Sequence, residues 1–387
     1  MKHLNKLILS FVIAGSSFLI SGELKALWQK AYGGSKKDLA YSSVQLDDGS
    51  IFLAGESKSW GKGKSDMLII KCDSHGNPKL RITFGEKERE VAKAIAKTSD
   101  GNLIVAGSTE SFSDSKDVYV VKFTKNGKKL WAKHFGGTDE DDEALAIAPT
   151  SNGGAIIVGW TESYGSGYKD GYLIYLDKNG NKMWEKAVGG KDDDVLTSIA
   201  FSKAGGFFVA GYTSSYGDNG QDFYVVKFDS KAHFQYKKVF GGENDEAINS
   251  IVATDDGGVV TAGWTESFDS KHKDIDVMKL NKDAKLVWHK IFGFKSQEWA
   301  NSITKAKDGG FVVAGTTKSF GFGSYDFYIL RLNNKGSSQW ANVFGGDSRD
   351  EAFSAITLKD GGYLVSGKTK SYGKGDFDFM YMKLKDR

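Results

Sequence analysis

Seven glycines recur along the chain at a constant interval of 52 residues: Gly55, Gly107, Gly159, Gly211, Gly263, Gly315 and Gly367. A serine stands four residues after each of these glycines, and an aromatic residue follows each serine directly. Self-similarity at a fixed period is the signature of repeat architectures, in which each repeat is one supersecondary unit that packs against its neighbours. The chain is therefore expected to consist of seven copies of one unit.

Each repeat reads as four short strands separated by turns. In the copy around Gly263, the strands are expected near residues 247–253, 259–265, 275–280 and 286–292. The second and third strands are almost continuously apolar, which is typical of a sheet that is covered on both faces. The 48 glycines and 2 prolines of the chain suit many short strands joined by tight turns. These features predict an all-β fold, a seven-bladed β-propeller of four-stranded blades.

The fourth strand of each repeat carries a large side chain, in most copies a tryptophan. This column reads Trp28, Leu80, Trp131, Trp184, Tyr236, Trp288 and Trp340. The next member would fall beyond Arg387, so the last repeat lacks a fourth strand, whereas residues 24–32 form a fourth strand without a blade of their own. We therefore expect residues 24–387 to form a single propeller in which residues 24–34 complete the last blade. Pairing of this N-terminal strand with the strand near residues 378–384 closes the ring and removes an exposed sheet edge.

Two segments, YVVKFTKNGKKLWAKHFGG at residues 119–137 and YLIYLDKNGNKMWEKAVGG at residues 172–190, carry a family resemblance. They resemble the tryptophan-docking repeats of quinoprotein-type propellers and the uncharacterised bacterial propeller-repeat proteins. The resemblance implies that the aromatic residues of the fourth strands wedge between adjacent blades. It does not imply the quinone cofactor, because the chain has no vicinal cysteine pair, and no cofactor is expected. The single cysteine, Cys72, lies in an apolar run and is interpreted as a packing residue.

Two columns of acidic residues keep the same period. The first consists of Asp38, Glu90, Asp142, Asp194, Glu246, Glu298 and Asp350. The second consists of Asp66, Asp117, Asp170, Asp222, Asp274, Asp326 and Asp378, of which the second member alone is displaced by one residue. A residue type present in every blade most simply serves what every blade needs, so we expect these carboxylates to accept hydrogen bonds from backbone N–H groups of the loops. A ring of calcium sites is the alternative, since carboxylate and carbonyl oxygens bind calcium.

Residues 1–22 have the pattern of a secretory signal peptide, because Lys2, His3 and Lys6 precede an apolar stretch from Leu7 to Ile20. Cleavage is expected between residues 21 and 26, which predicts a periplasmic or secreted protein of the bacterial envelope. An uncleaved membrane anchor is the alternative. The stretch is shorter than the roughly 20 apolar residues of a membrane span. No other segment of the sequence comes close to that length, so no span is expected after removal of the signal.

A ligand site in a symmetric scaffold is expected where the repeat departs from itself. The position after each column glycine reads Glu56, Ser108, Trp160, Tyr212, Trp264, Thr316 and Lys368. Three consecutive blades thus offer large aromatic side chains on the face that holds the longer loops. Together with Asp139, Asp141 and Asp193, these rings form a tentative binding patch for a sugar, a peptide or a partner loop. The alternative is that the rings fill gaps between blades.

These observations predict an exported, non-catalytic binding or scaffold protein that recognises a protein, peptide or glycan on its loop-rich face. An exported hydrolase or lyase that uses acidic residues on that face is one alternative, and a structural module of an envelope or surface assembly is another. The histidines lack the spacing of metal ligands, so no catalytic or metal-binding residue is assigned. The formal charge of +3 includes two lysines of the signal, and a nearly neutral mature chain gives no electrostatic reason to expect nucleic acid. A monomer is expected.

Overall fold

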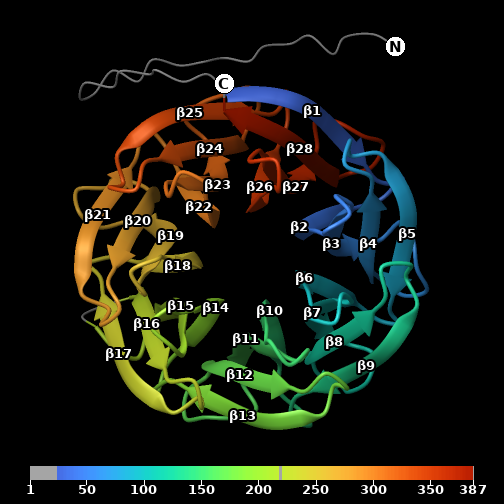
Figure 1. The fold of residues 1–387 in the computed structure, drawn as a ribbon, viewed down its shortest axis with the longest axis horizontal. Coiled ribbons are helices and arrows are strands. Elements are labelled where there is room, and N and C mark those ends of the chain that lie inside the picture. Colours follow the sequence, from blue (N-terminus) through green and yellow to red (C-terminus); the bar gives the residue numbers. More distant parts are fainter. Residues whose placement is uncertain (1–23, 218–219, 387) are drawn as a thin grey trace.

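The computed structural model describes residues 24–217 and 220–386, which form seven four-stranded antiparallel sheets arranged as the blades of a ring (Figure 1). The segment interpreted as a signal peptide lies outside the described residues. The described residues contain strands and turns but no helix, and within them no helix is long and apolar enough to cross a membrane. The predicted seven-bladed β-propeller is confirmed.

Blades 1 to 7 follow the order of the sequence, and each blade has an inner, a second, a third and an outer strand (Figure 1). The inner strands are β2 (Asp38–Gln45), β6 (Glu90–Lys97), β10 (Asp142–Pro149), β14 (Asp194–Phe201), β18 (Glu246–Ala253), β22 (Glu298–Lys305) and β26 (Asp350–Thr357). The second strands are β3 (Ile51–Ser57), β7 (Leu103–Thr109), β11 (Ala155–Thr161), β15 (Phe207–Thr213), β19 (Val259–Thr265), β23 (Phe311–Thr317) and β27 (Tyr363–Thr369). The third strands are β4 (Asp66–Cys72), β8 (Asp117–Phe123), β12 (Asp170–Leu176), β16 (Asp222–Phe228), β20 (Asp274–Leu280), β24 (Asp326–Leu332) and β28 (Asp378–Asp386). The outer strands are β5 (Pro78–Phe84), β9 (Lys129–Phe135), β13 (Lys182–Val188), β17 (Phe234–Phe240), β21 (Leu286–Phe292), β25 (Ser338–Phe344) and, for blade 7, β1 (Leu24–Tyr32).

The ring closes through β1, which is the outer strand of the last blade. It pairs antiparallel with β28, with Leu24 opposite Asp386 and Tyr32 opposite Phe379. The predicted closure by the N-terminal strand is therefore confirmed. The closure leaves β28 as an internal strand of its sheet instead of an exposed edge.

The hydrophobic core lies between blades and not within one of them. The cluster between blades 1 and 2, for example, combines Phe52 and Ile69 with Leu103 and Val121, all of them fully buried. The second and third strands are buried along nearly their whole length, since the neighbouring blades cover both of their faces. This arrangement explains the continuous apolar runs in the sequence.

The outer-strand tryptophans pack against the next blade. Trp131 of blade 2 donates from Nε1 to the carbonyl oxygen of Lys178 in blade 3, at 3.1 Å. Gly180 in the same turn has a φ of +81°, and a Cβ on this residue would lie 2.9 Å from the Trp131 ring. The wedge position that the resemblance implied is thus occupied, and a glycine is needed to receive the ring.

Candidate partner-binding face

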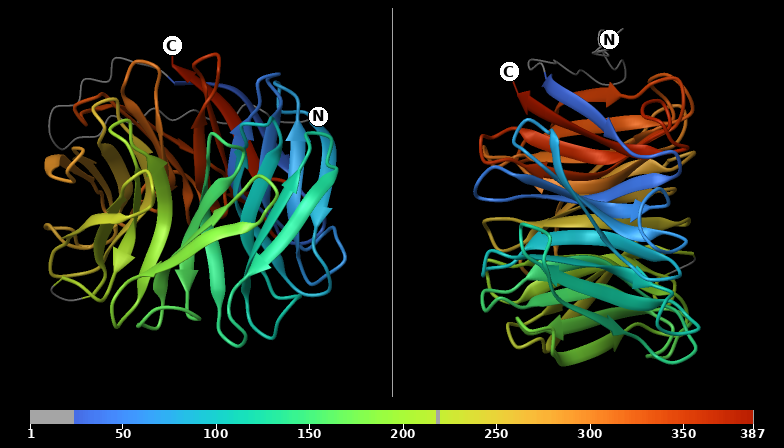
Figure 2. Two further views of the ribbon diagram at one scale, coloured as in Figure 1. Left: turned by 60° about the horizontal axis from the view of Figure 1, so that its bottom comes forward. Right: turned by 90° about the vertical axis from the view of Figure 1, so that its right-hand side faces the viewer.

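The loops that follow the outer strands and the loops that join the second and third strands share one side of the ring (Figure 2). We call this side the loop-rich face. The first acidic column ties its two kinds of loop together: in blade 3, Asp142 Oδ2 accepts from the Gly137 backbone at 3.1 Å and from Ser163 Oγ at 2.7 Å. Asp194 makes the equivalent bonds in blade 4, with Gly190 and Ser215.

The second acidic column shapes the loop before each third strand. Asp66 Oδ2 accepts from the backbone N–H groups of Lys62 and Gly63, at 2.9 and 3.0 Å. Asp117, the displaced member, departs from this pattern because its loop is one residue shorter, and it accepts instead from Ser113 Oγ at 2.7 Å.

The two acidic columns meet at the blade boundaries. Asp326 of blade 6 and Asp350 of blade 7 both lie beside Gly345, with oxygens 1.6 and 3.0 Å from where a Cβ on that glycine would stand. Burial, followed by repulsion from Asp350, raises the pKa of Asp326 to about 8. No group of three or more His, Cys, Asp or Glu side chains is placed to hold a metal ion among residues 24–217 and 220–386.

The aromatic rings of the tentative patch lie beneath lysine side chains. Trp160 is only 7% exposed, and the Nζ atoms of Lys116 and Lys169 lie 5.0 and 4.4 Å from its ring centre. Lys273 covers Trp264 in the same manner, with its Nζ at 3.4 Å. Through these cation–π contacts, lysines of the same chain already cover the faces of both tryptophan rings.

The remaining members of the patch differ in exposure. Tyr212 is half-buried, and burial together with the nearby Asp193 raises its pKa. Asp139 is exposed, whereas Asp141 accepts from the Lys116 backbone at 2.8 Å and lies 3.4 Å from Lys116 Nζ. The acids therefore offer more surface than the rings do.

A second departure from the repeat lies on the loop-rich face beside the inner strands. Here two residues of each blade share a backbone hydrogen bond of 2.7 to 2.9 Å. One residue precedes the acid of the inner strand, and the other precedes the column serine. These rim pairs, in blade order, are Lys37 with Lys58, Arg89 with Glu110, Asp141 with Glu162, Asp193 with Ser214, Asp245 with Glu266, Gln297 with Lys318 and Arg349 with Lys370.

The charges of the rim pairs are segregated around the ring. The charged members are all basic in blades 6, 7 and 1 and all acidic in blades 3, 4 and 5, while blade 2 has one of each. We call these groups of blades the positive sector and the negative sector. Blade 7 lies across the ring from blades 3 and 4 (Figure 1), so the two sectors oppose each other. This pattern of charges is also present in the sequence, at the positions directly before the first acidic column and the column serines.

Two hollows flank the shortened loop of blade 2. One, of about 540 Å³, is lined by acids and lysines that include Glu110, Asp114 and Asp141. The other, of about 370 Å³, is lined in part by Phe112 and His134, whose rings stack with their centres 4.9 Å apart. Ser113 of this loop lines both hollows.

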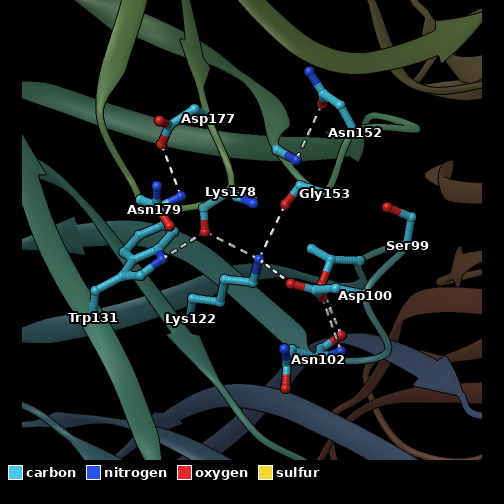
Figure 3. Close-up of polar contacts among 12 residues, drawn as sticks. Ser99, Asp100, Asn102, Lys122, Trp131, Asn152, Gly153, Asp177, Lys178 and Asn179 are labelled. Carbon is cyan, nitrogen blue, oxygen red and sulfur yellow. Dashed lines mark hydrogen bonds and ion pairs between the residues drawn. The ribbon is translucent and has the colours of Figure 1, made fainter.

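On the opposite face, several blades share an ion pair between a basic residue of the third strand and an aspartate of the turn between the first two strands. Lys122 is almost fully buried, and its Nζ contacts Asp100 Oδ2 at 2.7 Å and the carbonyl oxygens of Gly153 and Lys178 at 3.0 and 3.2 Å (Figure 3). Equivalent pairs join Lys279 to Asp256, Arg331 to Asp308 and Lys383 to Asp360. The basic residues follow the 52-residue period in the sequence, but two irregularities interrupt the column. Blade 2 is displaced by one residue, and blade 3 has Tyr175 in place of the basic residue.

Blade 4 lacks the carboxylate of this pairing. Ala204 takes the place of the aspartate, and Lys227 Nζ donates to the carbonyl oxygen of Gly205 at 2.8 Å. Burial lowers the pKa of Lys227 to about 8.

Comparison with known proteins agrees with the architecture. Residues 98–129 and 307–338 match the β-propeller domain of unknown function DUF5122. The regulatory protein FlaEY of Caulobacter vibrioides is 27% identical over 187 residues, which is 41% of this chain but only 20% of that relative's length.

Solved structures share the fold at low identity. The extracellular domain of the putative hybrid two-component system BT4673 from B. thetaiotaomicron is 14% identical with a TM-score of 0.54, over 92% of this chain and 43% of that chain. Chaetomium thermophilum Sqt1, bound to the N-terminus of ribosomal protein L10, is 12% identical with a TM-score of 0.51, over 91% and 98% of the two chains. The present chain is thus a seven-bladed β-propeller built from a 52-residue repeat, with two segments that match the DUF5122 β-propeller domain.

Proposed function

We propose that the protein is an exported, non-catalytic binding or scaffold protein that docks a protein partner across its loop-rich face. The observation that carries this proposal is the segregation of charge between the positive and negative sectors. Solubility alone favours a surface in which both signs are interspersed. Opposed patches of single sign instead orient a partner and select against one with the wrong charge pattern.

The form of the blade 2 hollow supports binding over catalysis. Two of its acids already have partners, since Lys64 pairs with Glu88 and Lys116 lies 3.4 Å from Asp141. Such pairs suit a docking surface, whereas a catalytic acid needs a carboxyl group held free of compensating cations.

Two comparisons favour the remaining parts of the proposal. Sqt1 has the same fold and is bound to a segment of another protein, which illustrates a partner-binding role for a single ring of this kind. The BT4673 propeller is an extracellular domain, in keeping with export through the signal pattern of residues 1–22. Asp139, Asp141 and Asp193 of the tentative patch then serve as part of the negative sector.

Capture from the native envelope fraction tests this function with three matched variants. The positive-sector variant carries Lys58→Glu, Lys318→Glu and Lys370→Glu, and the negative-sector variant carries Glu162→Lys, Asp192→Lys and Glu266→Lys, one from each of blades 3, 4 and 5. The control carries Lys128→Glu, Lys129→Glu and Lys178→Glu on the opposite face. Each is immobilised after its melting temperature has been shown to equal that of the wild type.

We expect the wild type and the control to retain the same partner, which mass spectrometry identifies, and both sector variants to lose it. Salt of about 500 mM should release the partner from the wild type, because it screens exposed charges beyond a few ångströms. Retention of the same partner by both sector variants would overturn the proposed function.

A further inference from the structure

The loop-rich face is complementary to itself in charge. The positive and negative sectors lie on opposite sides of one face (Figure 1). Consider a two-fold axis in the plane of this face, along the boundary between the two sectors. Rotation about this axis places the positive sector of one copy against the negative sector of the other. An isologous dimer needs a patch that is self-complementary under such a rotation.

In the positive sector, inner members of the rim pairs are paired with buried acids, whereas the outer lysines are exposed. Buried Glu56 pairs with Lys37 of blade 1 at 3.5 Å, and buried Glu351 pairs with Arg349 of blade 7. Lys58, Lys318 and Lys370 remain exposed at the outer positions. Lys370 lies 3.2 Å from exposed Asp376. Because an exposed pair of this kind contributes little, all three lysines can still contact a second molecule.

In the negative sector, the nearby lysines are held over the tryptophan rings. Lys169 lies 3.9 Å from Glu162 but also 4.4 Å from the Trp160 ring, and Lys273 lies 4.0 Å from Glu266. Pairs at such distances between exposed groups contribute little and leave the carboxylates open to a competing cation. Exposed Asp139, Glu140, Asp192 and Glu243 add further negative charge to the same blades.

Charges on the opposite face are used within the ring. Asp47 pairs with Lys97 and with Lys359, which come from the blades on either side of it. Asp255 likewise pairs with Lys203 and Lys305. These two aspartates are thus engaged by lysines of the same chain.

Apolar surface accompanies the charge on the loop-rich face. The aromatic residues after the column serines include Phe112, Tyr164, Phe268 and Tyr372, which are 38–46% exposed. Aromatic side chains are enriched in protein–protein interfaces relative to the rest of a protein surface. A partner that covers them gains hydrophobic contacts while the sectors set its orientation.

We propose that two copies of this chain pair face to face through their loop-rich faces, with the positive sector of each copy against the negative sector of the other. This inference rests on the proposed function, since it assigns the docking partner of the same face. The chain thereby becomes a two-ring scaffold.

Sedimentation velocity of the purified protein tests the pairing. In about 50 mM salt the wild type and the opposite-face control should sediment as concentration-dependent dimers, and in about 500 mM salt both should shift to monomers. The positive-sector and negative-sector variants should each remain monomeric at low salt, with association weakened about tenfold or more, because each then presents a face of one sign.

An equimolar mixture of the two sector variants provides the decisive arm. A face that is mainly negative then meets one that is mainly positive, so the mixture should form a mixed dimer although neither variant dimerises alone. A folding defect cannot produce this rescue. Wild-type protein that stays monomeric at low salt up to about 100 μM, or a mixture that stays monomeric while the wild type dimerises, would overturn the pairing.

The result also separates this inference from the proposed function. If the wild type is monomeric while both sector variants still lose the envelope partner, the self-pairing is wrong and the docking function stands. If the wild type dimerises through these sectors and no other protein depends on them, the partner of the face is the second copy.

Discussion

Lys122 Nζ and Asp100 Oδ2 form a 2.7 Å ion pair that links the third strand of blade 2 to the turn between its first two strands. The same two positions of blade 4 hold Lys227 and Ala204, so this lysine donates to a carbonyl oxygen in place of a carboxylate. Differences of this kind between equivalent positions in one ring allow matched experiments within a single protein.

Ala204→Asp should stabilise the protein. The new carboxylate would give Lys227 the partner that its counterparts have, and a hydrogen bond to a charged group contributes about 1.5 kcal/mol. The gain should be largest below pH 8, because the pKa of Lys227 is lowered to about 8 and the lysine is protonated below that value. Urea denaturation at pH 7 measures the change in the free energy of unfolding.

The matched control for that substitution is Asp100→Ala in blade 2. It leaves Lys122 buried with only carbonyl partners and should lower the free energy of unfolding by about 2 kcal/mol, less than for a fully buried pair because Asp100 is partly exposed. Destabilisation by Ala204→Asp would show that blade 4 has adapted to the smaller residue.

Gly180→Ala should destabilise the ring more than Gly101→Ala does. Both glycines have a φ near +80°, at +81° and +78°, so both substitutions carry the same backbone strain of about 1 kcal/mol. A Cβ at position 180 also meets the Trp131 ring at 2.9 Å, whereas a Cβ at position 101 has no atom within 4 Å. The difference between the two melting temperatures therefore measures the tryptophan wedge, and equal losses would contradict it.

The raised pKa of Asp326 should make the stability of the protein depend on pH. Burial and Asp350 raise its pKa to about 8 in the folded protein, so the folded state binds this proton more tightly than the unfolded chain, whose aspartate titrates near 3.9. The contribution of this group is fully present below pH about 4 and is lost as the pH rises toward 8. Asp326→Asn removes the titrating group, so wild-type stability should fall relative to this variant between pH 5 and 8, as followed by urea midpoints. Parallel pH profiles would contradict the assignment.

Removal of β1 should open the ring. The strand pairs along its length with β28, so a chain that begins at residue 34 leaves blade 7 with three strands and exposes apolar surface. We expect a lower melting temperature and aggregation, whereas a chain that begins at residue 23 should melt like the mature protein. Equal melting of the two truncated chains would contradict the closure.

The ring was predictable from the sequence because its constraints repeat. Glycines, acids and wedge residues recur at one period, and the missing fourth strand of the last repeat identified β1 as the closing strand. The surroundings of Trp160 could not be predicted in this way. The sequence placed it at the end of a second strand, but the two lysines that cover it come from loops of two different blades, and loop conformation is not periodic. The rim pairs were readable in the sequence, although only the shared backbone hydrogen bond shows that their members are neighbours.

The division of labour between repeated and variable residues can be tested within blade 3. Glu162 belongs to a rim pair, whereas Asp142, twenty residues earlier, belongs to a structural column and accepts bonds from two loops. The measurement is the amount of loop-rich-face partner, envelope protein or second copy, bound per mole of folded Glu162→Lys and Asp142→Asn protein. We predict that Glu162→Lys keeps the wild-type melting temperature and loses binding, while Asp142→Asn lowers the melting temperature and binds normally below its transition. Full binding by Glu162→Lys, combined with lost binding by folded Asp142→Asn, would contradict the claim that function resides where the repeat departs from itself.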